Sequence, residues 1–166
     1  ANALQEKFGF SALVSTRKEG LLKEQMDSRV PYLHLKKKRT FDLGAVLRLK
    51  KFIKKHKIEV LHAHSSSYFI AVMVWMLSKK LKIVWHDHYG NSEFLSQRKV
   101  GALRFFSNFF TAIISVNSNL EQWSKDHLKC RKVLYLPNFV LFANSTEAKV
   151  RLKRNSGKKI LLLANL

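Results

Sequence analysis

The sequence predicts an α/β protein built on a Rossmann-like parallel sheet with helices on both faces. Strand-like apolar runs alternate with helix-like segments along most of the 166 residues, which is the pattern of a mostly parallel sheet. Two of these runs each end in a pair of histidines, and helix-like sequence lies between them, as expected of neighbouring parallel strands. The 46% content of apolar residues argues against a disordered chain and suffices for a core.

The first elements are the end of a helix and two strands. Residues 1–9 have the pattern of the last turns of a helix that ends at Gly9. Strand-like runs follow at 10–15 and 32–35. Because the first helix follows no strand, we expect the chain to be a piece of a longer protein.

A basic amphipathic helix is predicted at 43–57. Its expected apolar stripe consists of Leu43, Val46, Leu47 and Ile53, with lysine and arginine largely off that stripe. The lysines that we expect to face an anionic membrane are Lys50, Lys51, Lys54 and Lys55.

The middle of the chain contains the two strands that end in histidines, at 58–64 and 83–88. Between them, residues 68–77 form the longest apolar run, which is too short to span a bilayer. This run therefore predicts a helix that is buried on both sides.

The next part of the chain predicts two more strands, at 111–116 and 133–136. A core helix is expected within 98–110, where phenylalanines cluster, and another helix at 118–128. These elements continue the alternation of strand and helix.

Composition then changes near the end of the chain. Residues 142–157 are polar and basic without a clear period, and an apolar strand pattern follows them. We therefore expect one domain at 1–142, a linker at 143–158 and the first strand of a second domain at 159–166.

Four histidines are the main candidates for a functional site. Alternate residues of a strand share a face, so His62 and His64 point the same way, as do His86 and His88. Ligands of open parallel sheets bind beyond the carboxyl ends of the strands, where these residues lie. No cysteine or third carboxylate stands at a metal-ligand spacing, so no metal is expected.

The segment after the second histidine-ended strand favours a functional interpretation of His88. Gly90 and its neighbours Tyr89 and Asn91 follow His88, and glycine allows a ligand to approach the backbone closely. For His62 and His86, a structural role as hydrogen-bonded core or rim residues is weighed equally with a functional one.

The charge of the chain is strongly positive. Lysine and arginine number 31 against 11 acidic residues, which gives a net charge of +20 and attracts phosphates in lipid, nucleotide or nucleic acid. Nucleic-acid binding favours aromatic residues interleaved with the charges, and here they cluster elsewhere, so an anionic membrane is the expected partner. The single cysteine, Cys130, excludes an internal disulfide and fits a reducing compartment.

Five motifs, taken in order, resemble the family 4 retaining glycosyltransferases of the two-domain GT-B type. They are Val-Leu-His-Ala-His-Ser at 60–65, Ile-Val-Trp-His-Asp-His-Tyr-Gly at 83–90, Ala-Ile-Ile-Ser-Val-Asn-Ser-Asn-Leu at 112–120, Val-Leu-Tyr-Leu-Pro-Asn-Phe-Val at 133–140 and Ile-Leu-Leu-Leu-Ala-Asn-Leu at 160–166. The resemblance implies that residues 1–142 are most of an acceptor-side domain and that 159–166 open a donor-binding domain.

The resemblance also implies roles for particular residues. His88 matches a histidine that lines the catalytic cleft near the transferred sugar, while His62 and His64 match a strand-end pair that supports the cleft. The residues expected to bind substrate are His64, His86, Tyr89, Gly90, Asn91 and Asn138.

The implied activity is transfer of a sugar, in the hexosyltransferase class, from a nucleotide-sugar donor to a glycan or lipid-linked acceptor in cell-surface polysaccharide synthesis. No cofactor is implied, because the nucleotide sugar is a substrate. The enzyme would be cytoplasmic and peripheral on the inner face of the plasma membrane, and the fragment alone would be inactive without its donor side. The alternatives are a nucleotide-sugar epimerase of GT-B architecture and a basic nucleic-acid-binding module.

Overall fold

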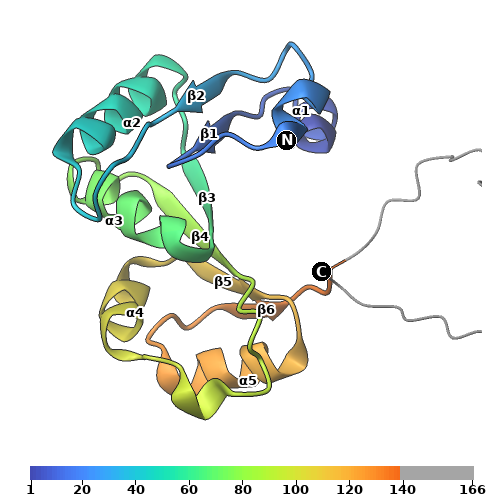
Figure 1. Ribbon diagram of the computed structural model, residues 1–166, viewed down its shortest axis with the longest axis vertical. Helices are drawn as coiled ribbons and strands as arrows, with labels where there is room; N and C mark the ends of the chain where they lie inside the picture. Colours follow the sequence, from blue (N-terminus) through green and yellow to red (C-terminus); the bar gives the residue numbers. More distant parts are fainter. Residues whose placement is uncertain (139–166) are drawn as a thin grey trace, which may run out of the picture.

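A computed structural model describes residues 1–138 as two parallel β-sheets with helices packed on them (Figure 1). The smaller sheet pairs β1 (Leu13–Ser15) with β2 (Tyr32–His34). The larger sheet has the order β3-β4-β5-β6, and every pair in it is parallel. Its strands are β3 (Val60–His64), β4 (Lys82–Asp87), β5 (Ala112–Ser115) and β6 (Val133–Tyr135). The predicted α/β class with parallel strands is confirmed.

Helices connect most of these strands. They are α1 (Asn2–Phe8), α2 (Leu43–Lys55), α3 (Tyr68–Met76), α4 (Gly101–Phe106) and α5 (Ser118–His127). Short 3-10 helices are η1 (Leu21–Gln25), η2 (Ser65–Ser67), η3 (Leu95–Gln97) and η4 (Ser107–Phe109). None of the described helices combines the length and the apolar content needed to cross a membrane.

Local sequence explains where three of the helices begin or end. The carboxylate of Asp42 accepts from the backbone N–H of Ala45 at the start of α2, and the side chain of Asn117 does the same for Leu120 in α5. Helix α1 ends at Gly9, which has a left-handed φ of 74°, as its position in the sequence predicts.

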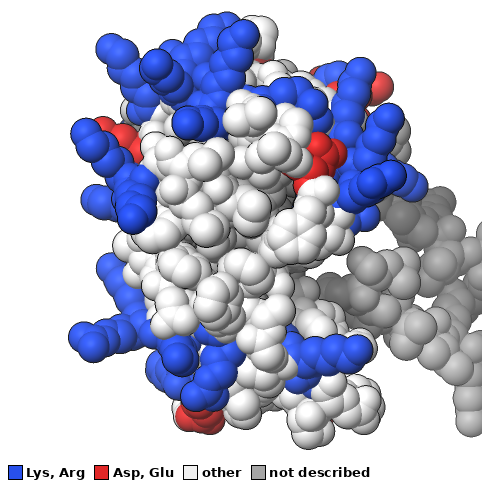
Figure 2. Space-filling view, turned by 90° about the vertical axis from the view of Figure 1, so that its left-hand side faces the viewer, with Lys and Arg blue, Asp and Glu red and all other residues white. Residues whose placement is uncertain are grey.

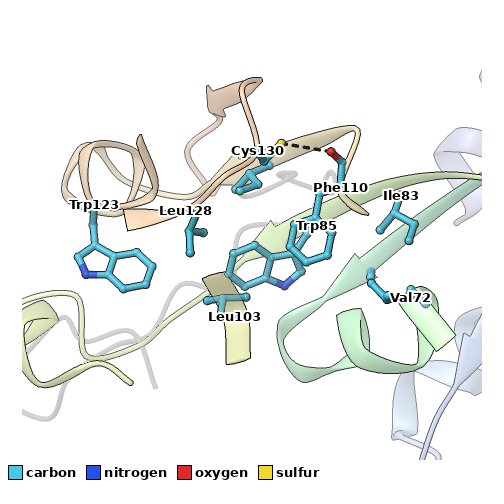
Figure 3. Packing of buried hydrophobic residues seen from close by; sticks show 11 residues of the cluster. Val72, Ile83, Trp85, Leu103, Phe110, Trp123, Leu128 and Cys130 are labelled. Carbon is cyan, nitrogen blue, oxygen red and sulfur yellow. Dashed lines mark hydrogen bonds between the residues drawn. The ribbon is translucent and has the colours of Figure 1, made fainter. Parts of the chain in front are cut away.

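The main hydrophobic core lies on one face of the four-stranded sheet. Ile83 and Trp85 of β4 and Ile113 of β5 pack there against side chains from α3, α4 and α5 (Figure 3). Cys130 is buried in the same cluster, and its thiol donates to the carbonyl of Phe110 over 3.4 Å. Within the described residues, the packed helical layer of this sheet therefore lies on one side.

The opposite face of the sheet is much less covered. It carries His62 and His64 of β3 and His86 of β4, since these alternate with the core residues along each strand. Val60 on this face is 50% exposed. The fold thus presents the histidines on the open side of the sheet.

A second core cluster joins α2 to α3. Helix α3 buries Ile70 and Val74 in this cluster, and Ala71 and Val72 in the cluster on the sheet, so it lies between two cores as its all-apolar sequence predicts.

The apolar stripe predicted for α2 is wrong at two positions. The helix buries Ala45, Val46, Leu49 and Ile53, whereas Leu43 and Leu47 are 67% and 52% exposed. Leu49 and Ile53 follow Val46 by three and seven positions, so these residues share the helix face that packs on α3. Leu43 and Leu47 lie on the flank beyond that face. The outer surface of α2 therefore contains leucine as well as lysine.

The predicted linker at 143–158 and the strand at 159–166 lie outside the described residues, as does the end of the first domain at 142.

Candidate functional site

The ends of β3 and β4 bring the histidines of two separate motifs together. The strands are in register with His64 beside His86, and His62 lies two residues back on β3. His88 follows directly after β4. The prediction that these residues gather at one edge of a parallel sheet is therefore confirmed.

The four imidazole rings form one stacked group, which we call the histidine cluster (His62, His64, His86 and His88). His86 is central: its ring centroid is 5.2 Å from that of His62, 5.0 Å from His64 and 4.0 Å from His88. The rings of His62 and His86 are nearly parallel, at 9°. The four rings therefore lie against one another at the two strand ends.

Hydrogen bonding within the histidine cluster is incomplete. Nδ1 of His64 and Nε2 of His88 are 3.2 Å apart, so one of them donates to the other according to the tautomers. Both ring nitrogens of His86, in contrast, are buried without a hydrogen-bond partner. Buried polar atoms without partners cost about 1–3 kcal/mol. Among the described residues, the hydroxyls of Ser115 and Ser124 are also buried without a partner.

The cluster shifts the protonation of its members. Burial of the rings away from water is the main cause, and repulsion by the neighbouring histidines is the second. Together they lower the pKa of His64 to about 4 and the pKa of His86 to about 4. The pKa of His62 is lowered for the same reasons. Although His62 and His64 expose much of their surface, these rings are neutral at neutral pH and their free nitrogens can act as acceptors or ligands.

The turn after β3 is fixed by side chains. Trp85 of β4 donates from its indole nitrogen to the carbonyl of Ser65 over 2.9 Å, and Ser67 donates to the carbonyl of His64 over 2.6 Å. Ser65 itself has a φ of 46°, an uncommon conformation for a residue with a side chain. These contacts hold the backbone of His64 in place.

The segment that carries His88 is anchored by a buried ion pair. Arg98 donates two hydrogen bonds to the carboxylate of Asp87, at 2.6 and 2.9 Å, and the two side chains are only 8% and 2% exposed. The guanidinium also lies 4.4 Å from the ring centre of Tyr89 and 4.2 Å from that of Trp123. Both chain neighbours of His88 therefore contact Arg98, which makes Arg98 a positioning residue for His88.

Sequence reasoning missed this role of Arg98. The carboxylate of Asp87 is occupied by Arg98, and the neighbouring acidic residue Glu93 is exposed. No spacing rule identifies the pair, because the two residues come together only when the loop of eleven positions folds back on β4.

The other predicted substrate-binding residues are Tyr89, Gly90, Asn91 and Asn138. Tyr89 is half-buried under Arg98, and Gly90 and Asn91 are exposed beyond it. A side chain at Gly90 would meet no atom within 4 Å, so this part of the loop is open to a ligand. Asn138 follows β6, at the same strand ends as the cluster but two strands along from β4.

A largely uncharged surface covers the face formed by α2, α3 and α4. Figure 2 shows lysine and arginine side chains at the top of this face and a broad uncharged area below them. Exposed apolar side chains on these elements and the loop before α2 include Phe41, Leu43, Leu47, Met76 and Phe105.

Aromatic contacts join part of this uncharged area into one band. The ring of Phe41 packs on Phe69 at 4.9 Å, Phe69 on Phe106 at 5.1 Å, and Phe106 on Phe105 at 5.4 Å. The four lysines predicted to face a membrane are all exposed on α2: Lys50, Lys51, Lys54 and Lys55. Spacings of three and four residues place Lys50 and Lys54 in line with Leu43 and Leu47.

The chain matches a known protein family. The family model described as Glycosyltransferase Family 4 matches residues 1–141. No curated protein matches the chain. The matched range contains the histidine cluster, the Asp87–Arg98 pair and the basic helix α2.

Proposed function

Since the chain belongs to Glycosyltransferase Family 4, we propose that it is part of a retaining hexosyltransferase. This enzyme moves a sugar from a nucleotide-sugar donor to a glycan or lipid-linked acceptor. The proposed setting is cell-surface polysaccharide synthesis. The observation that carries this proposal is His88, which follows a parallel strand, belongs to a stacked cluster and is anchored on both sides through Arg98.

Anchoring of this kind suits the chemistry of sugar transfer. The leaving diphosphate gains negative charge and the sugar gains positive charge in the transition state, and pre-positioned hydrogen bonds stabilise that separation. Because Asp87 and Tyr89 are fixed by Arg98, the imidazole of His88 needs little reorganisation when charge develops. No metal is needed for this step in the proposal, since basic groups and a helix N-terminus of the donor side can hold a diphosphate.

His64 determines which role His88 plays toward the substrate. If Nδ1 of His64 donates to Nε2 of His88, then Nδ1 of His88 carries a proton and can donate to a hydroxyl or phosphate oxygen. If the bond runs the other way, Nδ1 of His88 becomes an acceptor for the hydroxyl of an acceptor sugar. The His64–His88 contact thus supports a role for His64 in setting the tautomer.

The uncharged band and the lysines of α2 support a position at the membrane surface. Exposed leucine and phenylalanine can enter the headgroup region while lysine pairs with anionic lipid, as in interfacial amphipathic helices. We therefore place the enzyme on the inner face of the plasma membrane, where a lipid-linked acceptor is accessible. Nucleic acid is not a proposed partner, because the phenylalanine cluster at 105–110 lies outside the basic runs of the sequence.

The transfer proposal is tested in the enzyme that includes a donor-binding domain. His88→Ala should lower kcat roughly 10²-fold, the usual effect of losing one positioned hydrogen-bonding or acid–base group. Its Tm should change little, because His88 is partly exposed and contacts mainly other histidines. The matched control is His56→Ala at the C-cap of α2, outside the cluster, which should leave kcat unchanged.

Two results would contradict the proposal. Full turnover by the His88→Ala variant would remove this residue from the reaction. Conversion of the nucleotide sugar to its epimer without any acceptor, followed by NMR, would favour the epimerase over transfer.

A further inference from the structure

Three histidines of the cluster have the arrangement of a metal-binding site. His62, His64 and His86 each offer a ring nitrogen, and these three atoms lie within 4.8 Å of one another. Two of the residues alternate on β3, and the third comes from the adjacent strand at the position in register with His64. We propose that this triad binds a transition-metal ion of the zinc type.

The distances fit such a site after small movements of the rings. Tetrahedral zinc has Zn–N bonds of about 2.0–2.1 Å, which places its ligand nitrogens about 3.4 Å apart. Bringing nitrogens that lie up to 4.8 Å apart to this separation moves the ring nitrogens by roughly an ångström. Side-chain rotation of His62 and His64 can supply this movement, because both residues are exposed. The backbone need not move, because two paired strands already hold all three residues on one face.

The unpartnered nitrogens of His86 are an independent indication. Both of its ring nitrogens are buried without a hydrogen bond, although buried polar atoms are nearly always satisfied. An ion shared with His62 and His64 gives one of these nitrogens a partner. The stacked rings need no other ligand from the protein, and a fourth position stays open to water or a substrate oxygen.

The contact between His64 and His88 resembles the support that metal ligands usually have. A histidine that binds a metal through one nitrogen commonly donates from the other to a neighbouring acceptor, which fixes its orientation. With His64 ligating through Nε2, its Nδ1 donates to Nε2 of His88 at the observed 3.2 Å. His88 is then a positioning residue for the ion.

The ligand set also determines which ions the site prefers. Imidazole suits Zn²⁺, Ni²⁺ and Cu²⁺, whereas Mg²⁺ and Mn²⁺ prefer carboxylate oxygens. The nearest carboxylate along β4, that of Asp87, is bound to Arg98. The net charge of +20 opposes any cation, so affinity has to come from coordinate bonds to nitrogen.

The site goes beyond the proposed transfer reaction, which needs no metal. On sequence grounds no metal was expected, because neither cysteine nor carboxylate stands at a ligand spacing. The third ligand comes instead from the neighbouring strand, which the pairing of β3 with β4 supplies.

The test is a calorimetric titration of the tag-free 166-residue protein, dialysed from EDTA, with ZnCl₂. We expect one ion per chain, and Co²⁺ in its place should give the absorption of a tetrahedral nitrogen site. MgCl₂ should give no heat of binding. A stoichiometry well above one, or equal binding of Mg²⁺, would indicate only general association with surface groups and would overturn the proposal.

Variants locate the ion. His62→Ala and His86→Ala should each abolish the one-to-one binding, and His88→Ala should weaken it by roughly ten- to one hundredfold as an outer partner. His56→Ala is the matched control and should bind zinc as the wild type does. Circular dichroism checks that each variant is folded; a folded His62→Ala variant with unchanged zinc affinity would refute the site.

Discussion

The buried pair of Asp87 and Arg98 allows a quantitative prediction about what positions His88. Arg98→Met keeps most of the side-chain volume but removes the guanidinium. It leaves the carboxylate of Asp87, which is 2% exposed, without its partner. Breaking a buried ion pair from one side costs about 3–5 kcal/mol.

The lost ring contacts act in the same direction. Arg98 lies over Tyr89 and Trp123, and such contacts contribute about 0.5–2 kcal/mol each, although they are not additive with the ion pair. Domains of this kind have unfolding free energies of about 5–15 kcal/mol, so the variant loses a large share of its stability. A decrease of Tm by roughly 6–20 °C corresponds to 3–5 kcal/mol in a chain of this size.

Denaturant unfolding of four proteins measures the effect. The wild type is compared with Arg98→Met, Asp87→Asn and the double variant, in which no buried charge remains. The double variant should be more stable than Arg98→Met, because the unpaired carboxylate is gone. The control is Lys125→Met, which breaks the exposed pair with Glu121 and should cost about 0.3–0.5 kcal/mol at most.

Two outcomes would refute this reasoning. If Arg98→Met unfolded at nearly the same denaturant concentration as the wild type, Arg98 would not anchor the segment that carries His88. A double variant no more stable than Arg98→Met would show that the two charges do not act on each other.

Two further predictions concern α2. In the first, the four lysines of its outer surface are replaced by glutamine: Lys50, Lys51, Lys54 and Lys55. The free energy of binding to anionic vesicles, measured by co-sedimentation, should fall by up to about 4 kcal/mol, at roughly 1 kcal/mol for each lysine near the lipid. Glutamine at Lys129 and Lys132, beyond α5, is the control, and equal binding to neutral vesicles would argue against this electrostatic contribution. In the second, the backbone N–H groups of Ala45 and Lys38 hold the pKa of Asp42 below its usual 3.8. The contribution of the ionised Asp42 to the free energy of unfolding is therefore fully present above pH 3.8, and it is lost as the pH falls through the lower folded-state pKa. Asp42→Asn keeps the cap without titrating, and its unfolding free energy should depend less on pH in that window; identical pH profiles would show that Asp42 is not responsible.

The sequence by itself determined the elements and the faces of the strands. All six strands predicted between residues 10 and 136 are present as β1 to β6, each within a few residues of its expected bounds. Period-two alternation placed His62 and His64 on one face, and the parallel connection through α3 placed His86 and His88 at the same strand ends. These are local properties, since alternation and capping depend on residues near one another in the chain.

The tertiary structure decided which side chains meet. The register of His64 with His86 made four separate imidazoles into one stacked cluster. The fold of the loop after β4 brought Arg98 back to Asp87, and the position of α3 determined that α2 buries Leu49 while exposing Leu47. Each of these depends on contacts between elements, because a periodic pattern gives the direction of a side chain but not the neighbour that it will touch.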